Sequence, residues 1–239
     1  MRLEGKRTFL TGAAAGIGAA TAEVFRREGA VVHGVDVAGA EGVHHCDVTD
    51  PASVQAAVDA AAAEMGGIDV CANVAGVNLF CSLEHMTLDV WNRHLAVNLT
   101  GPMLVTQACL PHLRESTGNV VTVASISGIQ GQPHNSSYCA SKGGLRLFMK
   151  SIAVELASEG IRVNMVDPGG VATAMSDGAL ARPELVGEID HGHFTRMTGV
   201  LPGGMMPPTR IAEALAFLAS DASASTTGSE LVVDGGTLW

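Results

Sequence analysis

The stretch TGAAAGIGAAT, from Thr11 to Thr21, follows the short β-branched run RTFLT and decides the fold predicted for this 239-residue chain. Its glycines Gly12, Gly16 and Gly18 permit a tight turn and a close approach of backbone to a pyrophosphate. The helix predicted to begin here offers unpaired N–H groups and a favourable dipole to such an anion. A glycine-rich turn alone is a weak signal, so its place between a strand and a helix is what favours a dinucleotide site.

Six further strand-like runs alternate with alanine-rich helical stretches. They are AVVHGVD (30–36), GVHHCD (42–47), IDVCAN (68–73), NVVTVAS (119–125), IRVNMVD (161–167) and ELVVDG (230–235). A helix is predicted from Pro51 to Met65, because Asp50 can cap it and Gly66 can stop it. The alternation predicts an α/β fold in which a parallel, doubly wound sheet forms one domain over residues 1–239.

Composition restricts the partners and the compartment. The formal charge of -10 opposes binding to nucleic acid and to anionic membranes. Five cysteines without a CxxC pair, and no secretory signal at the start, favour reduced thiols and a cytoplasmic location. His94 to Leu113 lacks charged residues but contains Asn98 and two prolines, so we expect a long helix buried against protein and no membrane span.

Polar residues gather where the predicted strands end, which is where open parallel sheets bind ligands. Asp36 stands 18 residues after Gly18, at the place of an acid that binds both adenosine ribose hydroxyls and thereby selects NAD over NADP. Asp47 and Val48 end the next strand, where Asp47 could reach the adenine amino group. Other strand ends carry NVAG at 73–76, Ser125, and DPGGVAT at 167–173, which would place Thr173 near the nicotinamide amide.

Tyr138 is the only tyrosine of the chain, and Lys142 follows it four residues later on a predicted helix. Residues at this spacing share a helix face, so the ammonium can stabilise a phenolate. Acid–base work near neutral pH would need the phenol pKa to fall by roughly 2 to 3 units from its usual value near 10. Ser125 would hold the substrate oxygen, and Asn98 could anchor water for proton passage.

The motifs TGAAAGIG, NVAG and YCASK, with Asn98 and Ser125, resemble the single-domain members of the short-chain dehydrogenase/reductase family. The resemblance runs from Lys6 to Gly236 and implies a Rossmann-type seven-stranded sheet in the order 3-2-1-4-5-6-7. It implies catalysis by Asn98, Ser125, Tyr138 and Lys142, and a homotetramer in which the helix at 88–114 forms a subunit contact. The cofactor contacts expected on this basis are Gly12, Ala14, Gly16, Ile17, Gly18, Asp36, Asp47, Val48, Asn73, Ala75, Gly76, Tyr138, Lys142, Pro168, Gly169, Val171 and Thr173.

Some segments depart from the family pattern or need a separate interpretation. Only ten residues separate Asp36 from Asp47, so a short turn should replace the usual helix there. Residues 174–208 have weak periodicity and are expected to form a substrate lid. His191 and His193 are interpreted as loop residues, and no metal site is expected. Substrate-pocket candidates are Asn78, Leu79, Phe80, Ile126, Gln130, His134 and Met175.

The leading hypothesis is an NAD-dependent oxidoreductase that transfers hydride between the nicotinamide and a secondary alcohol or ketone. An alternative is a reductase of 3-oxoacyl groups on acyl carrier protein, which the neutral or acidic segments ESTGN (115–119) and LASEGIR (156–162) argue against. A non-enzymatic alternative is an NAD(H)-sensing regulatory protein. Steroid, sugar, cyclic alcohol and aromatic dihydrodiol substrates all fit the sequence.

Overall fold

A computed structural model describes residues 1–178, 183–186 and 199–238. Seven parallel strands form one sheet in the order β3-β2-β1-β4-β5-β6-β7, which confirms the predicted fold class and strand order. The strands are β1 (Arg7–Thr11), β2 (Val31–Asp36), β3 (His44–His45), β4 (Val70–Asn73), β5 (Asn119–Val123), β6 (Arg162–Pro168) and β7 (Glu230–Val233). The third strand is much shorter than expected, because only Val35–His44 and Asp36–His45 pair.

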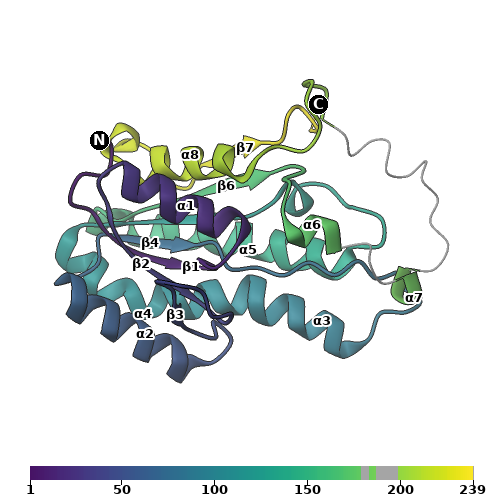
Figure 1. The fold of residues 1–239 in the computed structure, drawn as a ribbon, viewed down its shortest axis with the longest axis horizontal. Coiled ribbons are helices and arrows are strands. Elements are labelled where there is room, and N and C mark those ends of the chain that lie inside the picture. Colours follow the sequence, from purple (N-terminus) through teal and green to yellow (C-terminus); the bar gives the residue numbers. More distant parts are fainter. Residues whose placement is uncertain (179–182, 187–198, 239) are drawn as a thin grey trace.

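Helices cover both faces of the sheet (Figure 1). One face carries α1 (Gly16–Arg27) and α8 (Pro208–Ala219), whose buried side chains share a core with Leu10, Val70 and Val166. The other carries α2 (Pro51–Met65), α4 (Gly101–Ser116) and α5 (Ser136–Leu156), whose core includes Phe9, Cys71 and Val120. Alternate residues of the central strands β1, β4, β5 and β6 therefore enter opposite cores, as in a doubly wound sheet.

Helix α2 has the predicted bounds, and its end signals act as expected. The Asp50 side chain accepts a hydrogen bond from the Ala52 N–H at 3.0 Å, Pro51 occupies the first turn, and Gly66 ends the helix with φ of 75°. Between β2 and β3 the chain makes a short turn with an Ala40–Val43 bridge, which confirms that no helix lies there.

The long helix predicted across 88–114 is built in three parts. It comprises α3 (Leu88–Leu95), the π-helical turn η1 (Ala96–Thr100) and α4. A π turn inserts one extra residue into the helix and is often found at functional sites. Asn98 lies in this turn and is fully buried. No helix among the described residues is long and apolar enough to cross a membrane.

Shorter helical elements complete the fold: the 3-10 turns η2 (Ile126–Gly128), η3 (Ala157–Glu159) and η5 (Asp221–Ser223), and the helices α6 (Ala174–Gly178) and α7 (Pro183–Val186). Two parts of the expected lid at 174–208, residues 179–182 and 187–198, lie outside the described residues, so the lid stays a prediction. Its far end returns to the sheet where Met206 donates a backbone hydrogen bond to the Gly170 carbonyl at 2.9 Å.

The glycine-rich turn brings the start of α1 against the end of β1. A β-carbon added at Gly18 would lie 1.8 Å from the Gly12 carbonyl oxygen, a distance that backbone atoms cannot tolerate without moving. This contact explains why a residue inside a buried helical turn has no side chain.

We expect Gly18→Ala to lower the free energy of unfolding by about 3 kcal/mol, because the added methyl group must displace backbone. Gly39→Ala is the control, since a β-carbon there would meet nothing within 4 Å. That control should change stability by less than about 1 kcal/mol. Urea denaturation of both variants measures the difference, and equal midpoints would contradict the packing described here.

Candidate active site

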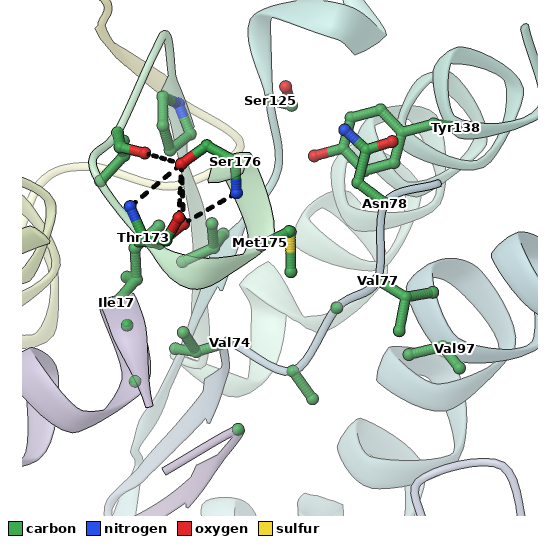
Figure 2. A pocket seen from close by; sticks show the side chains of 18 of the residues that line it. Ile17, Val74, Val77, Asn78, Val97, Ser125, Tyr138, Thr173, Met175 and Ser176 are labelled. Atoms are coloured by element: carbon green, nitrogen blue, oxygen red, sulfur yellow. Dashed lines mark hydrogen bonds between the residues drawn. The ribbon is translucent and has the colours of Figure 1, made fainter. Parts of the chain in front are cut away.

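A cavity of about 540 Å³ opens at the carboxyl ends of the central strands, a size ordinary for small-molecule and cofactor sites. Its wall draws on the glycine-rich turn, the ends of β2, β4, β5 and β6, and α5. Figure 2 shows the Tyr138 ring with its hydroxyl pointing into the space that Ser125 also borders. The predicted residues that line the cavity are Gly12, Gly16, Ile17, Gly18, Asp36, Val48, Ala75, Gly76, Ser125, Tyr138, Lys142, Pro168, Gly169, Val171 and Thr173.

One end of the cavity can hold an anion. Gly12 has φ of 73°, and a β-carbon there would lie 2.8 Å from the Ala75 backbone, so only glycine lets this turn lie so close to the loop after β4. Ala15 precedes α1 and makes no side-chain cap, which leaves the first N–H groups of the helix without an internal partner. These groups and the helix dipole suit a phosphate.

A fixed negative charge stands beside this turn. The Asp36 carboxylate accepts hydrogen bonds from the Ala38 N–H at 2.9 Å and the Ala14 N–H at 3.1 Å. Asp36 lines the cavity, whereas Ala14 does not and acts by orienting that carboxylate. The arrangement fits a ligand with hydroxyl groups at this point and opposes a second phosphate.

Besides Ala14, two predicted contacts do not line the cavity. Asp47 turns its carboxylate to the Thr49 N–H and hydroxyl, at 2.9 and 2.7 Å, and these bonds hold its pKa below the usual value. Asn73 donates to the Thr106 hydroxyl at 3.0 Å and is only 3 % exposed. Their neighbours Val48 and Ala75 line the wall instead.

Asn98 holds one wall of the cavity in place. Its side-chain oxygen accepts from the Val77 N–H at 2.8 Å, and its amide nitrogen donates to the Val77 carbonyl at 2.9 Å. The same nitrogen donates to the Ser141 hydroxyl of α5 at 3.1 Å. Both amide hydrogens and one lone pair of the amide oxygen are thus used in structural bonds. The role of Asn98 in anchoring water for proton passage stays a prediction.

His94 makes a parallel link that the sequence did not reveal. Its Nε2 accepts from the Leu79 N–H at 3.0 Å, so its other nitrogen carries the proton and donates to the Ser137 hydroxyl at 2.8 Å. Burial lowers the pKa of this imidazole and keeps it neutral. Its ring also meets the Tyr138 ring edge-on, with centroids 6.0 Å apart.

Ser125, Tyr138 and Lys142 come together as predicted. The Ser125 hydroxyl contacts the Ser127 hydroxyl at 3.1 Å, and the Lys142 ammonium lies 5.8 Å from the centre of the Tyr138 ring. Lys142 also donates to the Val123 carbonyl at 2.8 Å, which ties α5 to the end of β5.

The pKa values of the two titratable groups are shifted by burial. Burial raises the pKa of Tyr138 to about 12, although a hydrogen bond with Ser125 acts in the opposite direction. Burial lowers the pKa of Lys142 to about 8, and the charge of Asp167 opposes that change. Without a cofactor the phenol pKa therefore rises, because the loss of solvent outweighs the nearby groups. The fall expected with Lys142 and an oxidised nicotinamide beside the phenol stays a prediction.

The residues predicted to line the substrate pocket do not all border the same cavity. Those that line the main cavity are Asn78, Phe80, Ile126 and Met175. Leu79 borders an adjoining cavity near α3. Gln130 and His134 line neither of these two cavities. Thr173 is held by Ser176, whose hydroxyl accepts from the Thr173 N–H at 3.0 Å (Figure 2).

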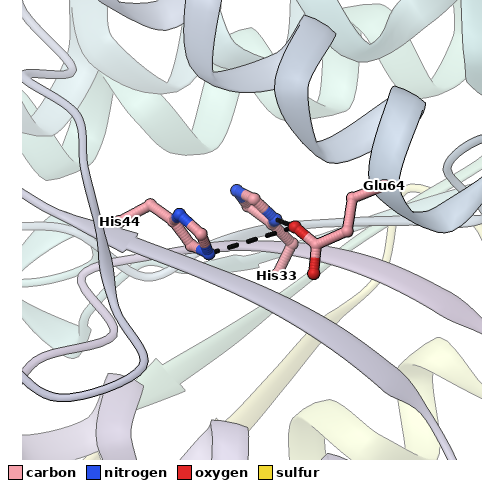
Figure 3. Close-up of side chains that lie close together, drawn as sticks. All are labelled: His33, His44 and Glu64. Atoms are coloured by element: carbon pink, nitrogen blue, oxygen red, sulfur yellow. Dashed lines mark hydrogen bonds and ion pairs between the residues drawn. The ribbon is translucent and has the colours of Figure 1, made fainter.

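A cluster of His33, His44 and Glu64 lies apart from this cavity (Figure 3). The His33 imidazole contacts the Glu64 carboxylate at 2.8 Å, and the two imidazole rings stack with centroids 4.0 Å apart and planes within 11°. Nitrogen lone pairs lie in the ring planes, and two nearly parallel planes give no shared position for a cation. We interpret the cluster as a stacked pair of imidazoles that both contact the Glu64 carboxylate, His33 at 2.8 Å and His44 at 4.0 Å. His191 and His193 lie outside the described residues.

Comparison with known proteins supplies independent information. The family model described as enoyl-(acyl carrier protein) reductase matches residues 12–237. D-threitol dehydrogenase of Mycolicibacterium smegmatis is 38 % identical, with 98 % of this chain and 94 % of that protein covered. The 3-oxoacyl-[acyl-carrier-protein] reductase of Thermotoga maritima is 36 % identical, with 99 % of each covered.

Solved structures agree with the sequence relatives. Carveol dehydrogenase from Mycobacterium avium, in complex with NAD, superposes with a TM-score of 0.88 at 30 % identity over 99 % of each chain. A short-chain dehydrogenase from Mycobacterium paratuberculosis bound to NAD gives the same TM-score at 28 % identity over 99 % of each chain.

We expect Tyr138 to stay protonated at pH 10, where a free tyrosine is half ionised and a phenol of pKa about 12 is ionised to about 1 %. Because the chain has a single tyrosine, phenolate absorbance reports this residue alone. Tyr138→Phe supplies the blank, and the wild type in denaturant should titrate normally. A folded protein that is half ionised at pH 10 would contradict the raised pKa.

Proposed function

The chain belongs to the short-chain dehydrogenase/reductase family of oxidoreductases, and from this premise we propose that it interconverts a secondary alcohol and a ketone with NAD as cofactor. One observation carries the proposal: Ser125, Tyr138 and Lys142 line the same cavity as the glycine-rich turn and Asp36. Two of the similar proteins are named as dehydrogenases of the alcohols D-threitol and carveol, which supports the same reaction class here.

We assign proton transfer to Tyr138 and substrate positioning to Ser125. With a pKa of about 12 the phenol is protonated at neutral pH, so the free protein is ready to donate a proton to a ketone oxygen. The Ser125 hydroxyl, which already interacts with the phenol, would share that oxygen. A nicotinamide bound in the cavity would supply or accept the hydride. Lys142 favours the phenolate when the reaction runs towards the ketone.

NAD is the proposed cofactor because of Asp36. Its carboxylate is fixed by two backbone N–H groups at the cavity rim, where it would accept hydrogen bonds from ribose hydroxyls. A 2'-phosphate at the same place would meet charge repulsion, and neither Ala15 nor Val37 offers a compensating positive charge.

The substrate part of the cavity favours a compact, mainly apolar alcohol. Phe80, Ile126 and Met175 supply apolar wall, and Asn78 and Gln132 supply polar groups. A few polar groups on an apolar wall orient a ligand and select among similar ones.

Reduction of 3-oxoacyl groups on acyl carrier protein is the second candidate, favoured by the Thermotoga maritima relative. The sequence argument against it is wrong, because the two segments on which it relies do not lie near the cavity. ESTGN and LASEGIR precede β5 and β6, so they lie at the amino ends of these strands, opposite the cavity. The exposed Arg93 lines the cavity and could face an acidic carrier, so Asp36 carries the remaining argument against an NADPH-dependent reductase.

A cytoplasmic homotetramer is the proposed state. Leu147 and Val154, seven residues apart on α5, are 72 % and 80 % exposed, and α5 packs against α3, which is part of the helix expected at the contact. Light scattering that gives the 24.5 kDa mass of one chain would contradict the oligomer.

We expect Tyr138→Phe to reduce kcat with secondary alcohols by at least about a hundredfold, because the proton acceptor is removed. NADH affinity should change little, since the ring that fills the cavity remains. Steady-state rates and NADH fluorescence titration measure the two quantities. Near-normal turnover in Tyr138→Phe would refute the assignment, and wild-type NADH binding without turnover on a broad alcohol and ketone panel would favour the regulatory alternative.

We expect kcat/KM to be higher with NADH than with NADPH by about a hundredfold or more, because a 2'-phosphate meets the Asp36 charge. Asp36→Asn should lower the ratio of kcat/KM with NADH to kcat/KM with NADPH, mainly by raising kcat/KM with NADPH. Asp59→Asn, an exposed site on α2, is the matched control and should leave the ratio unchanged. A wild-type preference for NADPH with 3-oxoacyl thioesters would support the second candidate.

A further inference from the structure

Asp167 is a buried carboxylate behind the candidate catalytic side chains. It lies in β6 just before Pro168, has no solvent exposure, and accepts a hydrogen bond from the Ser125 N–H at 3.1 Å. Its second oxygen is buried without a hydrogen-bond partner. A buried carboxylate with one unused oxygen is costly, so a nearby charge must offset part of that cost.

The charged groups around Asp167 come from two elements. Lys142 and Arg146 face it from α5, and Glu230 faces it from β7. Arg146 forms a two-pronged ion pair with Glu230, at 2.9 and 2.7 Å, and Lys150 contacts Glu230 at 3.2 Å. Arg146 contacts Glu230, and its charge also acts on Asp167. Lys142 has no carboxylate contact among the described residues, and it is the second cation whose charge acts on Asp167, less strongly than that of Arg146.

We propose that Asp167 is a positioning residue of the active site, whose carboxylate keeps Lys142 in its ammonium form and fixes the backbone that presents Ser125. The inference rests on the roles proposed above for Ser125 and Lys142. It adds a residue that does not line the cavity and acts only through these two neighbours.

The pKa values of Asp167 and Lys142 set the pH range in which both groups are charged. Burial and Glu230 raise the pKa of Asp167 to about 6, while Arg146, Ser125 and Lys142 act against that rise. Burial lowers the pKa of Lys142 to about 8, and the charge of Asp167 is the influence that raises it. Asp167 loses its charge as pH falls through about 6, and Lys142 loses its charge as pH rises through about 8. Both groups are charged only between these limits.

The test measures Lys142 directly in the cofactor-free protein. The chain has three lysines, Lys6, Lys142 and Lys150, so carbon-13-labelled lysine gives few NMR signals. Asp167→Asn keeps an oxygen that accepts from the Ser125 N–H but removes the charge. We expect the Lys142 titration to move to lower pH by about one unit, while that of Lys6 stays in place. Asp59→Asn is the matched control on the surface of α2.

An unchanged Lys142 titration in folded Asp167→Asn would overturn the proposal. If that variant does not fold, Glu230→Gln tests the same coupling, because removing the Glu230 charge lets Asp167 ionise at lower pH. In the wild type, the NMR signal of Lys142 should shift slightly at the pH where Asp167 becomes charged. In Glu230→Gln this shift should occur at a lower pH, and a shift at the wild-type pH would overturn the coupling.

Kinetics supply the second readout. If Asp167 supports the charge of Lys142, the high-pH fall in kcat/KM moves to lower pH in Asp167→Asn by about the same one unit. A uniform loss of rate at every pH would indicate a merely structural role and would overturn the proposal. A wild type without alcohol or ketone turnover would defeat the proposed function and leave the NMR test of Asp167 intact.

Discussion

The buried ammonium of Lys142 is the constraint on which the site depends. Its hydrogen bond to the Val123 carbonyl requires α5 to pass close to the end of β5. A β-carbon at Gly128 would lie 2.8 Å from the Lys142 carbonyl, so the η2 turn and α5 touch through their backbones. This contact places Ser125, at the start of η2, opposite Tyr138 on α5. The polar pair thus follows from the packing that lets a cation be buried between a strand end and a helix.

The loop at residues 76–79, which borders the main cavity and the adjoining one, is joined to the same helix. Asn98 binds both Val77 and Ser141, and His94 binds both Leu79 and Ser137. Ser137 and Ser141 flank Tyr138 on α5, one residue before it and three after it. Displacement of this loop would therefore disturb the helix turn that carries the phenol. The π turn at Ala96–Thr100 is part of this link, because it contains Asn98.

Features set by neighbouring residues could be predicted from the sequence, and features set by distant packing could not. Asp50, Pro51 and Gly66 are local signals, and α2 has the predicted bounds. The strand order followed from the family resemblance and agrees with the structure. Three features could not be predicted: the π turn, the hydrogen bond of the Asn73 side chain to Thr106, and the raised pKa of Tyr138. Each depends on burial or on partners that are distant in the sequence. The sequence identifies Asp167 only as the end of a strand, because the role proposed for it depends on Lys142 and Ser125, which stand 25 and 42 positions earlier in the chain.

The overall charge of -10 is compatible with a site for an anionic dinucleotide, because the two effects act over different distances. Surface charges farther away than about 10 Å are screened at ordinary ionic strength. The helix N-terminus, the turn at Gly12 and Lys142 act at contact and inside a partly closed cavity, where screening is weak. Asp36 acts over the same short range with the opposite sign, so the proposed discrimination between ribose hydroxyls and a phosphate would not prevent phosphate binding at the turn. If NAD is the cofactor as proposed, its selection rests on this one carboxylate and its two backbone donors, and changes of net charge elsewhere on the surface should leave that selection unaltered.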